Sequence, residues 1–329
     1  MSATRPRLRM GAIALVAAGA VVATPIAPAH AASDVRILVV FDESAAQNPE
    51  GIAVDRRGDV FVSISSRGDL WKIPAGSTTP EPFGHVDGII GGRDFGLLGL
   101  AVDVFGNVYG AVQSADPAAN GVWRFDRSTG DATRLPGTLG IGIANGLAFD
   151  TRGNLYITDS AAGAIWRIPW GKSASVWLQD PALTGDGSLQ LGVPLGANGI
   201  AYRNGLLTIT NTERRTILSV PTWDPGALRV VATLSGNPDG VTMDVRGNAY
   251  VAINLQDTIL RVSPGGSAAV VASGDPLDFP SSVAFGTARG ERRTLFGVNF
   301  SIGELFGLPP GFGPAVYTID IGTPGVPVP

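Results

Sequence analysis

Asn145-Gly146-Leu147-Ala148-Phe149-Asp150-Thr151-Arg152-Gly153-Asn154 is the stretch of this 329-residue sequence that decides its fold. The apolar alternation after Gly146 predicts a strand, and Asp150 with Gly153 predicts a tight turn that sends the chain back as a hairpin. Related segments give six copies, whose anchor positions are Gly51, Gly99, Gly146, Gly199, Gly240 and Ser282. Successive anchors are 41 to 53 residues apart, a period typical of propeller blades.

The copies also contain further strands. A third strand follows the hairpin, as in residues 165–168, and a fourth, outer strand is expected at residues 175–178, 228–234 and 268–272. The sixth copy has strands near 294–299 and 315–319 but no fourth strand after them, whereas residues 35–41 form a spare strand at the other end of the chain. The sequence therefore predicts an all-β, six-bladed β-propeller, a single domain over residues 32–329, whose last blade is closed by the N-terminal strand.

The composition agrees with this architecture. With 45 Gly and 24 Pro the chain is too interrupted for a helical fold, and 44% hydrophobic residues are enough for a packed core. There is no cysteine, which excludes thiolate zinc sites, disulfides and cysteine nucleophiles, and there are only two histidines. No Gly-x-Ser-x-Gly motif occurs, which argues against a serine hydrolase.

The N-terminus has the features of a secretory signal peptide over residues 1–31. Three arginines precede an apolar stretch over residues 10–23, and the small-residue triplet Ala29-His30-Ala31 follows. The apolar stretch is shorter than the about 20 residues that a spanning helix needs. We therefore expect an exported protein, secreted or held in the periplasm or cell envelope. Cleavage changes the net charge from −4 to −7, so we expect no nucleic-acid partner and no membrane association after cleavage.

The residue before each anchor position is predicted to face the central tunnel, because equivalent positions of a propeller lie at equal height around its axis. In chain order these residues are Glu50, Leu98, Asn145, Asn198, Asp239 and Ser281. Two carboxylates and two amides supply hard oxygen ligands that suit a calcium ion. The alternative is that Asn-Gly and Asp-Gly serve only as turn formers. That alternative does not account for Glu50.

The repeats, with Pro-Glu-Gly in the first copy, Ala-Asn-Gly in the third and fourth and Pro-Asp-Gly in the fifth, resemble the senescence marker protein/gluconolactonase family. Its relatives include diisopropyl fluorophosphatase. The resemblance covers essentially the whole chain after the signal peptide. It implies a catalytic divalent cation, calcium or another, in the tunnel mouth. The ligands that it implies are Glu50, Asn145, Asn198 and Asp239.

Two features depart from the sugar-lactone members of that family. Those members carry an arginine two residues before the third-copy asparagine, and this chain has Ile143 there. The apolar run Phe95-Gly96-Leu97-Leu98 enters the second blade, which favours a less polar lactone or ester as substrate. A long connection that includes residues 88–94 is expected to cover the mouth.

The resulting hypothesis is an exported, metal-dependent hydrolase of a lactone or ester, in which the cation polarises the carbonyl. Asp239 is the expected general base or nucleophile, and His85 is either a proton shuttle or an exposed loop histidine. We expect a monomer with a small-molecule substrate. The alternatives are a non-catalytic propeller that binds a small ligand or a protein, and a lyase-type propeller enzyme.

Overall fold

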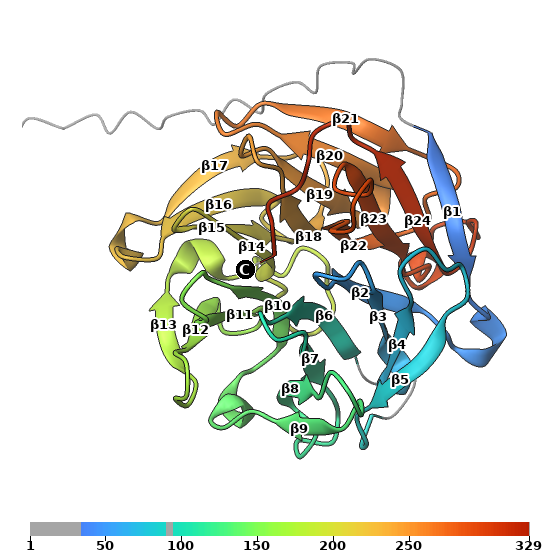
Figure 1. Ribbon diagram of the computed structural model, residues 1–329. Coiled ribbons are helices and arrows are strands. Elements are labelled where there is room, and N and C mark those ends of the chain that lie inside the picture. Colours follow the sequence, from blue (N-terminus) through green and yellow to red (C-terminus); the bar gives the residue numbers. More distant parts are fainter. Residues whose placement is uncertain (1–33, 90–94, 329) are drawn as a thin grey trace, which may run out of the picture.

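The computed structural model describes residues 34–89 and 95–328. They form six four-stranded antiparallel sheets that surround a central axis like the blades of a propeller (Figure 1). This arrangement confirms the fold predicted from the repeats. The described residues contain short 3-10 turns but no α-helix, and none of their helical segments is long and apolar enough to cross a membrane.

Each blade is a meander that runs outward from the axis. Blade 1 contains β2 (Pro49–Val54), β3 (Val60–Ile64), β4 (Asp69–Ile73) and β5 (Glu81–His85). Blade 2 contains β6 (Gly96–Val102), β7 (Val108–Gln113), β8 (Gly121–Phe125) and β9 (Ala132–Arg134). Blade 3 contains β10 (Ala144–Phe149), β11 (Leu155–Asp159), β12 (Ala164–Ile168) and β13 (Ser175–Gln179). Blade 4 contains β14 (Ala197–Arg203), β15 (Leu206–Asn211), β16 (Thr216–Pro221) and β17 (Arg229–Thr233). Blade 5 contains β18 (Pro238–Met243), β19 (Ala249–Ile253), β20 (Thr258–Val262) and β21 (Ala268–Ser273).

Blade 6 joins the two ends of the chain. Its strands are, from the axis outward, β22 (Pro280–Phe285), β23 (Thr294–Asn299), β24 (Ala315–Asp320) and β1 (Val35–Val40). Strand β1 pairs antiparallel with β24, with Val35 opposite Ile319. The closure by the N-terminal strand is therefore confirmed, and it completes the ring of blades and covers the outer edge of β24.

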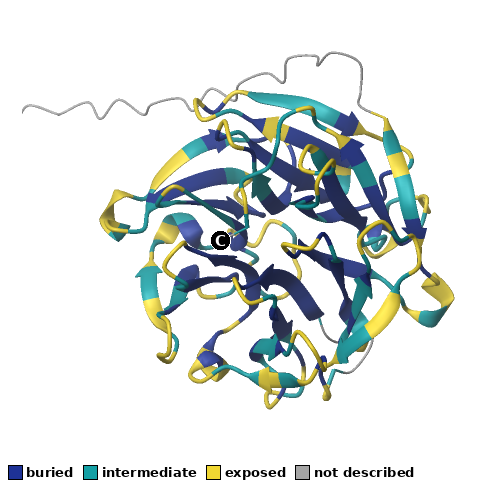
Figure 2. Cartoon of the chain, viewed as in Figure 1, coloured by how far each residue is buried: buried dark blue, intermediate teal, exposed yellow. Residues whose placement is uncertain are grey.

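Burial falls from the axis to the rim, as Figure 2 shows. The first strands of the blades are almost entirely buried, whereas outer strands such as β5 and β13 are largely exposed. The core consists of apolar clusters between neighbouring blades. The axis is therefore the place where a polar side chain is most strongly shielded from water.

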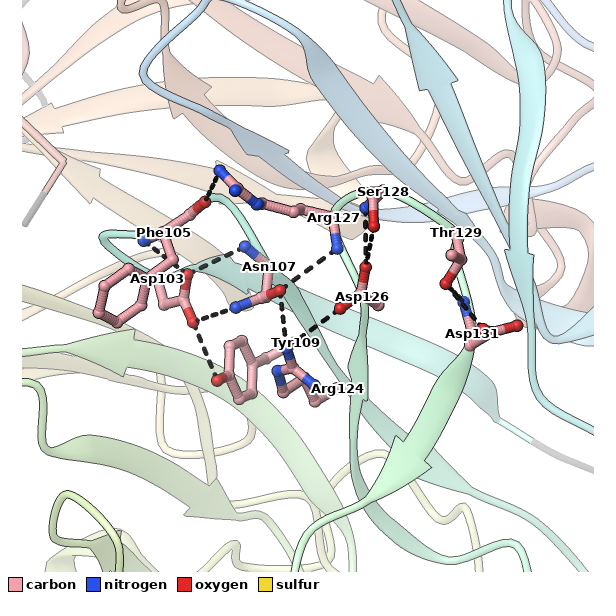
Figure 3. Close-up of polar contacts among 10 residues, drawn as sticks. All are labelled: Asp103, Phe105, Asn107, Tyr109, Arg124, Asp126, Arg127, Ser128, Thr129 and Asp131. Carbon is pink, nitrogen blue, oxygen red and sulfur yellow. Dashed lines mark hydrogen bonds and ion pairs between the residues drawn. The ribbon is translucent and has the colours of Figure 1, made fainter.

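In blades 1, 2, 3 and 5 the hairpin turn at the far end of the first strand is held by a buried aspartate: Asp55, Asp103, Asp150 and Asp244. In blade 2, Asp103 accepts hydrogen bonds from the backbone N–H groups of Phe105 and Asn107, both at 2.9 Å. Its other oxygen accepts from Asn107 Nδ2 at 2.8 Å and from the Tyr109 hydroxyl at 3.1 Å (Figure 3). Arg124 of the third strand donates to Asn107 at 2.9 Å. The Asp-x-x-Gly-Asn pattern thus fixes the first two strands of the blade.

The tunnel is closed at this turn end by the C-terminal segment. Val326 donates its backbone N–H to the Met243 carbonyl at 2.9 Å, and Val245 donates to the Pro324 carbonyl at 3.0 Å. Residues 326–328 line a cavity of about 190 Å³ together with the last residues of the six first strands. The C-terminal segment therefore lies across the turn end of the axis.

Candidate functional site

The six predicted ring residues lie where the first strands begin, and each occupies a bulge. In β10 the pairing with β11 shifts between Ala144 and Leu147, which leaves Asn145 and Gly146 in the irregularity. The same shift occurs around the ring residues of β2, β6, β14, β18 and β22. A bulge bends the strand and re-aims a side chain, so the repeat places equivalent side chains toward the axis.

The anchor glycines allow the first strands to approach each other. A Cβ atom on Gly146 would lie 2.4 Å from the Asn198 carbonyl oxygen of the next blade. Gly199 meets the Asp239 carbonyl in the same way at 2.4 Å. A side chain at these positions would force the blades apart at the mouth. The glycines therefore tighten the ring as well as form turns, which the sequence pattern alone did not show.

Two carboxylates meet at the axis. Glu50 belongs to blade 1 and Asp239 to blade 5, which are not neighbours, yet the charge of Asp239 raises the pKa of Glu50. Their side chains are therefore near enough for the charge of one to act on the other. Burial is the largest cause of both shifts: it raises the pKa of Glu50 well above its usual value and that of Asp239 to about 7. Hydrogen bonds from Asn254 and Asn198 oppose the shift of Asp239.

The carboxylate of Glu50 is the least satisfied polar group of the site. Glu50 is 5% exposed, and its Oε2 atom is buried without a hydrogen-bond partner among the described residues. No ion pair involves Glu50 or Asp239 within residues 34–89 and 95–328. Two buried carboxylates without a cation are costly, because the negative charge is neither solvated nor neutralised.

The two amides present oxygen atoms to the same space. Asn145 Nδ2 donates to Ser160 Oγ at 3.3 Å, and Asn198 Nδ2 donates to Thr212 Oγ1 at 2.9 Å. Because their nitrogen atoms are engaged behind the ring, the amide oxygens are free to face the axis. The described residues contain no cluster of three or more His, Cys, Asp or Glu side chains, so the amides are essential to any cation site here.

These residues fit a hard divalent cation. The set combines two carboxylates with two amide oxygens, and a divalent ion would neutralise the two negative charges and satisfy Glu50 Oε2. The remaining ring positions are not charged: Leu98 is apolar and buried, and Ser281 donates its hydroxyl to the Glu50 carbonyl at 2.7 Å. Glu50, Asn145, Asn198 and Asp239 all lie where the first strands begin, and their role as cation ligands stays a prediction.

His85 is not brought to this ring. The expectation was either a proton shuttle or an exposed loop histidine, whereas His85 is the last residue of β5, the outermost strand of blade 1. Its side chain is 51% exposed, and Nδ1 lies 2.8 Å from Asp69 Oδ1, opposite it on β4. Pairing with β4 draws His85 into the outer strand and away from the axis. A proton-shuttle role would require a position at the mouth.

The apolar side of the mouth lies between blades 2 and 3. Leu98 packs in one cluster with Ile141 and the partly buried Phe95. Ile143 is buried as well, and its backbone N–H donates to Asp159 at 3.1 Å. The expected cover over residues 88–94 lies mostly outside the described residues, which omit 90–94.

Sequence reasoning missed three polar side chains behind the ring: Ser160, Thr212 and Asn254. Each follows the second strand of its blade and contacts the ring residue of that blade. They lie 15, 14 and 15 residues after Asn145, Asn198 and Asp239. This recurring offset was a signal available in the repeats.

Solved structures support the fold-level resemblance. A protein assigned as a gluconolactonase is 15% identical, with a TM-score of 0.66 over 90% of this chain and 95% of its own. The calcium-binding protein regucalcin from Agrobacterium tumefaciens is 17% identical, with a TM-score of 0.64 over 90% and 97%. A catalytically inactive histidine-to-alanine variant of virginiamycin B lyase from Staphylococcus aureus is 12% identical, with a TM-score of 0.59 over 87% and 99%.

Sequence comparison gives no further relative. No protein-family model matches the chain, and no curated protein matches it significantly. At the identities above, the structural matches show a shared fold. The resemblance to gluconolactonase-type propellers inferred from the repeats is thus confirmed in architecture, and the activity must be argued from the site.

Proposed function

We propose that this protein is an exported, divalent-cation-dependent hydrolase of a lactone or ester. The observation that carries the proposal is the pair of buried carboxylates, Glu50 and Asp239, that converge from non-adjacent blades without a cationic partner among the described residues. A divalent ion would neutralise both carboxylates. The pair is therefore more easily explained by binding of such an ion than by a contribution to the stability of the fold.

Calcium is the proposed ion, because all four candidate ligands supply oxygen. Glu50, Asn145, Asn198 and Asp239 would hold it in the tunnel mouth. A bound cation would polarise the substrate carbonyl and stabilise the negative charge that develops on its oxygen. The amides of Asn145 and Asn198 add neutral dipoles, so that the two carboxylates set the charge of the site.

Asp239 is the proposed proton acceptor or nucleophile. One of its oxygens, Oδ2, accepts from Asn254 at 2.8 Å, and the reacting atom would be the other oxygen, Oδ1. In the first route this oxygen takes a proton from the water that attacks the carbonyl carbon. In the second route it attacks that carbon itself. Either route uses the ionised carboxylate, which burial disfavours and a nearby cation would restore.

The substrate is proposed to be less polar than a sugar lactone. Leu98, Ile141 and Phe95 form an apolar wall beside the ring, and Ile143 stands where an arginine would bind sugar hydroxyls in the family that the sequence resembles. Such a wall favours aliphatic or aromatic groups on the lactone or ester.

The alternative functions have less support. The inactive virginiamycin B lyase variant has a histidine replaced, whereas the histidine that remains here after signal cleavage lies on an outer strand. A propeller that only binds a protein would not need two uncompensated carboxylates in its tunnel. Gluconolactonase and regucalcin, named for lactone hydrolysis and calcium binding, support the proposed chemistry.

The proposal is tested by metal removal followed by a substrate panel. The purified protein is treated with a chelator, and hydrolysis of aliphatic, aromatic and sugar lactones and of aryl esters is followed by acid release. We expect turnover to be lost with the chelator, to return with calcium, and to be highest for apolar lactones or esters. Hydrolysis that persists after complete metal removal would refute the metal-dependent mechanism.

A matched variant controls for a general effect of losing a buried charge. Glu213→Gln removes a buried carboxylate that accepts backbone N–H groups of Gly187 and Leu189 outside the ring. It should retain calcium-dependent turnover, whereas Glu50→Gln should lose it. Equal activity of the two variants would contradict the assignment of Glu50.

A further inference from the structure

Ser160, Thr212 and Asn254 lie directly behind three of the ring residues. Each sits at the end of the second strand of its blade and contacts the ring residue of the first strand. All three are buried. Their hydrogen bonds are directional, and this direction determines which atoms of the ring residues can face the axis.

The hydroxyl groups behind the amides can only accept from them. Ser160 Oγ donates its single hydrogen to the Ala197 carbonyl at 2.6 Å, and Thr212 Oγ1 donates to the Pro238 carbonyl at 2.9 Å. A hydroxyl that already donates its hydrogen can only accept further hydrogen bonds through its lone pairs. Its ring partner must therefore donate an N–H group. Asn145 and Asn198 are therefore held with nitrogen outward and oxygen toward the axis.

The group behind Asp239 has the opposite polarity. Asn254 Nδ2 carries two hydrogens, one donated to Asp239 Oδ2 at 2.8 Å and one to the Pro280 carbonyl at 3.0 Å. A carboxylate needs a donor behind it, and the position equivalent to Ser160 and Thr212 is an amide in this blade. Each supporting side chain thus has the polarity that its ring residue requires.

The same bonds link successive blades. Ala197, Pro238 and Pro280 immediately precede the ring residues of the next blades, and Ser281 then donates to the Glu50 carbonyl at 2.7 Å. The chain of contacts therefore runs from Asn145 through blades 3, 4, 5 and 6 to Glu50 in blade 1. It contacts the side chains of Asn145, Asn198 and Asp239 but only the backbone of Glu50, and Ser63 of blade 1 donates in the same way to the Leu98 carbonyl of blade 2 at 2.9 Å.

We propose that Ser160, Thr212 and Asn254 are positioning residues that form one hydrogen-bonded arc, which orients three of the four candidate oxygen ligands, those of Asn145, Asn198 and Asp239, for a divalent cation. This inference rests on the cation site of the proposed function. The arc sets ligand orientation before the ion arrives, so its loss weakens cation affinity more than it weakens the fold. Outer partners of metal ligands typically contribute about 10- to 100-fold in affinity.

Thr212→Val and Thr210→Val form a matched test. Both threonines are buried on the same edge of blade 4, but Thr210 donates only to backbone carbonyls, with Asp239 O at 2.6 Å, and contacts no ring side chain. Calcium affinity is measured by titration calorimetry of the full-length protein. We expect Thr212→Val to bind calcium at least about 10-fold more weakly than Thr210→Val, and Thr212→Ser to stay close to wild type.

Asn254→Leu provides a second variant at a different blade. It removes both donated hydrogen bonds at similar volume, and we expect the same loss of affinity. If Thr212→Val and Thr210→Val bind calcium equally, the arc does not position the ligands and the inference fails. If the wild-type protein itself does not bind calcium, the proposed function is overturned instead.

A metal-free measurement keeps these two failures apart. The side-chain amide signals of Asn198 in the chelated protein should shift in Thr212→Val and remain in place in Thr210→Val, because Asn198 Nδ2 donates to Thr212 Oγ1, whereas Thr210 Oγ1 donates to backbone carbonyls. Unchanged signals in Thr212→Val would overturn the arc whatever the protein binds.

Discussion

Buried carboxylates at the two ends of the propeller, Asp103 at a turn and Glu50 at the mouth, are held in opposite ways. At the turn end, Asp103 accepts four hydrogen bonds, from two backbone N–H groups, an amide and the Tyr109 hydroxyl. At the mouth, Glu50 Oε2 has no partner among the described residues. Both side chains are at most 5% exposed. Burial alone therefore does not distinguish Asp103 from Glu50, whereas the hydrogen bonding of their oxygen atoms does.

The difference has a physical basis. A carboxylate that accepts several N–H and O–H groups is solvated by the protein, and its charge stabilises the turn. A carboxylate that is buried without donors destabilises the fold unless something binds to it. The repeat uses the first arrangement at its turns and the second at its mouth, and the contrast can be tested by substitutions at each end.

The largest effect is expected for Asp239→Asn at the mouth. It keeps the volume but removes one of two charges and the proposed base or nucleophile. We expect lactone or ester turnover to fall by about 10³- to 10⁴-fold, or about 4 to 5 kcal/mol in activation free energy. The measurement is kcat/KM at saturating calcium.

Asp103→Asn is the counterpart at the turn end. It should leave kcat/KM within a few-fold of wild type, since Asp103 contacts no ring residue. Comparable losses of activity in Asp103→Asn and Asp239→Asn would remove the distinction between the two ends.

The second effect is on the pH dependence of stability. Burial raises the pKa of Asp239 to about 7, above the usual 3.8, so the folded metal-free protein holds this proton more tightly than the unfolded chain. The stabilisation is complete below about pH 4 and is lost as the pH rises through 7. For Asp239 alone the loss is about 4 kcal/mol. The raised pKa of Glu50 acts in the same direction.

Urea denaturation in a chelator measures this effect. Wild type should lose stability between pH 4 and pH 8 relative to Asp239→Asn, and calcium at pH 8 should restore wild type only. If the stabilities of the two metal-free proteins change with pH in parallel, the pKa of Asp239 is not raised in the folded protein.

The third effect is on the turn itself. Asp103→Ala leaves two backbone N–H groups and the Asn107 side chain without their acceptor in a buried hairpin. We expect the free energy of unfolding to fall by about 2 to 3 kcal/mol, with calcium affinity unchanged. Thermal denaturation and calcium titration of the same variant check the two statements. A loss of affinity as large as that of Glu50→Gln would show that the two ends are coupled.

The sequence predicted the architecture well because the blade period repeats and its turns have a defined chemistry. The six anchors, the outer strands of blades 3, 4 and 5 and the closing strand over 35–41 follow from local patterns, and the structure has β1 at Val35–Val40 paired with β24. The ring followed from symmetry, since equivalent positions lie at equal height. Neither inference needed a side-chain contact.

The supporting contacts were beyond the sequence. Ser160, Thr212 and Asn254 form hydrogen bonds with ring residues about 15 positions away and with backbone carbonyls of the next blade. Only the folded structure shows which group donates each of these hydrogen bonds. His85 was misplaced for the same reason, because its pairing with Asp69 in β4 decides that it belongs to an outer strand.

The smallest effect is expected for Tyr109→Phe, which removes one of the four hydrogen bonds to Asp103. Blade 1 already contains the result of this change: Phe61 occupies the position of Tyr109, and Asp55 accepts only from the backbone N–H groups of Arg57 and Asp59. The turn therefore forms without the hydroxyl, and we expect a loss of about 1 kcal/mol.

The loss should not depend on pH. Burial, with the charge of Asp103 beside it, raises the pKa of Tyr109 above its usual value, so the hydroxyl remains a donor from pH 5 to 9. Urea denaturation of Tyr109→Phe at both pH values measures this. Equal small losses would place Tyr109 among the redundant donors of a fully solvated carboxylate, whereas a loss above about 3 kcal/mol would mean that Asp103 depends on single contacts, as Glu50 does at the mouth.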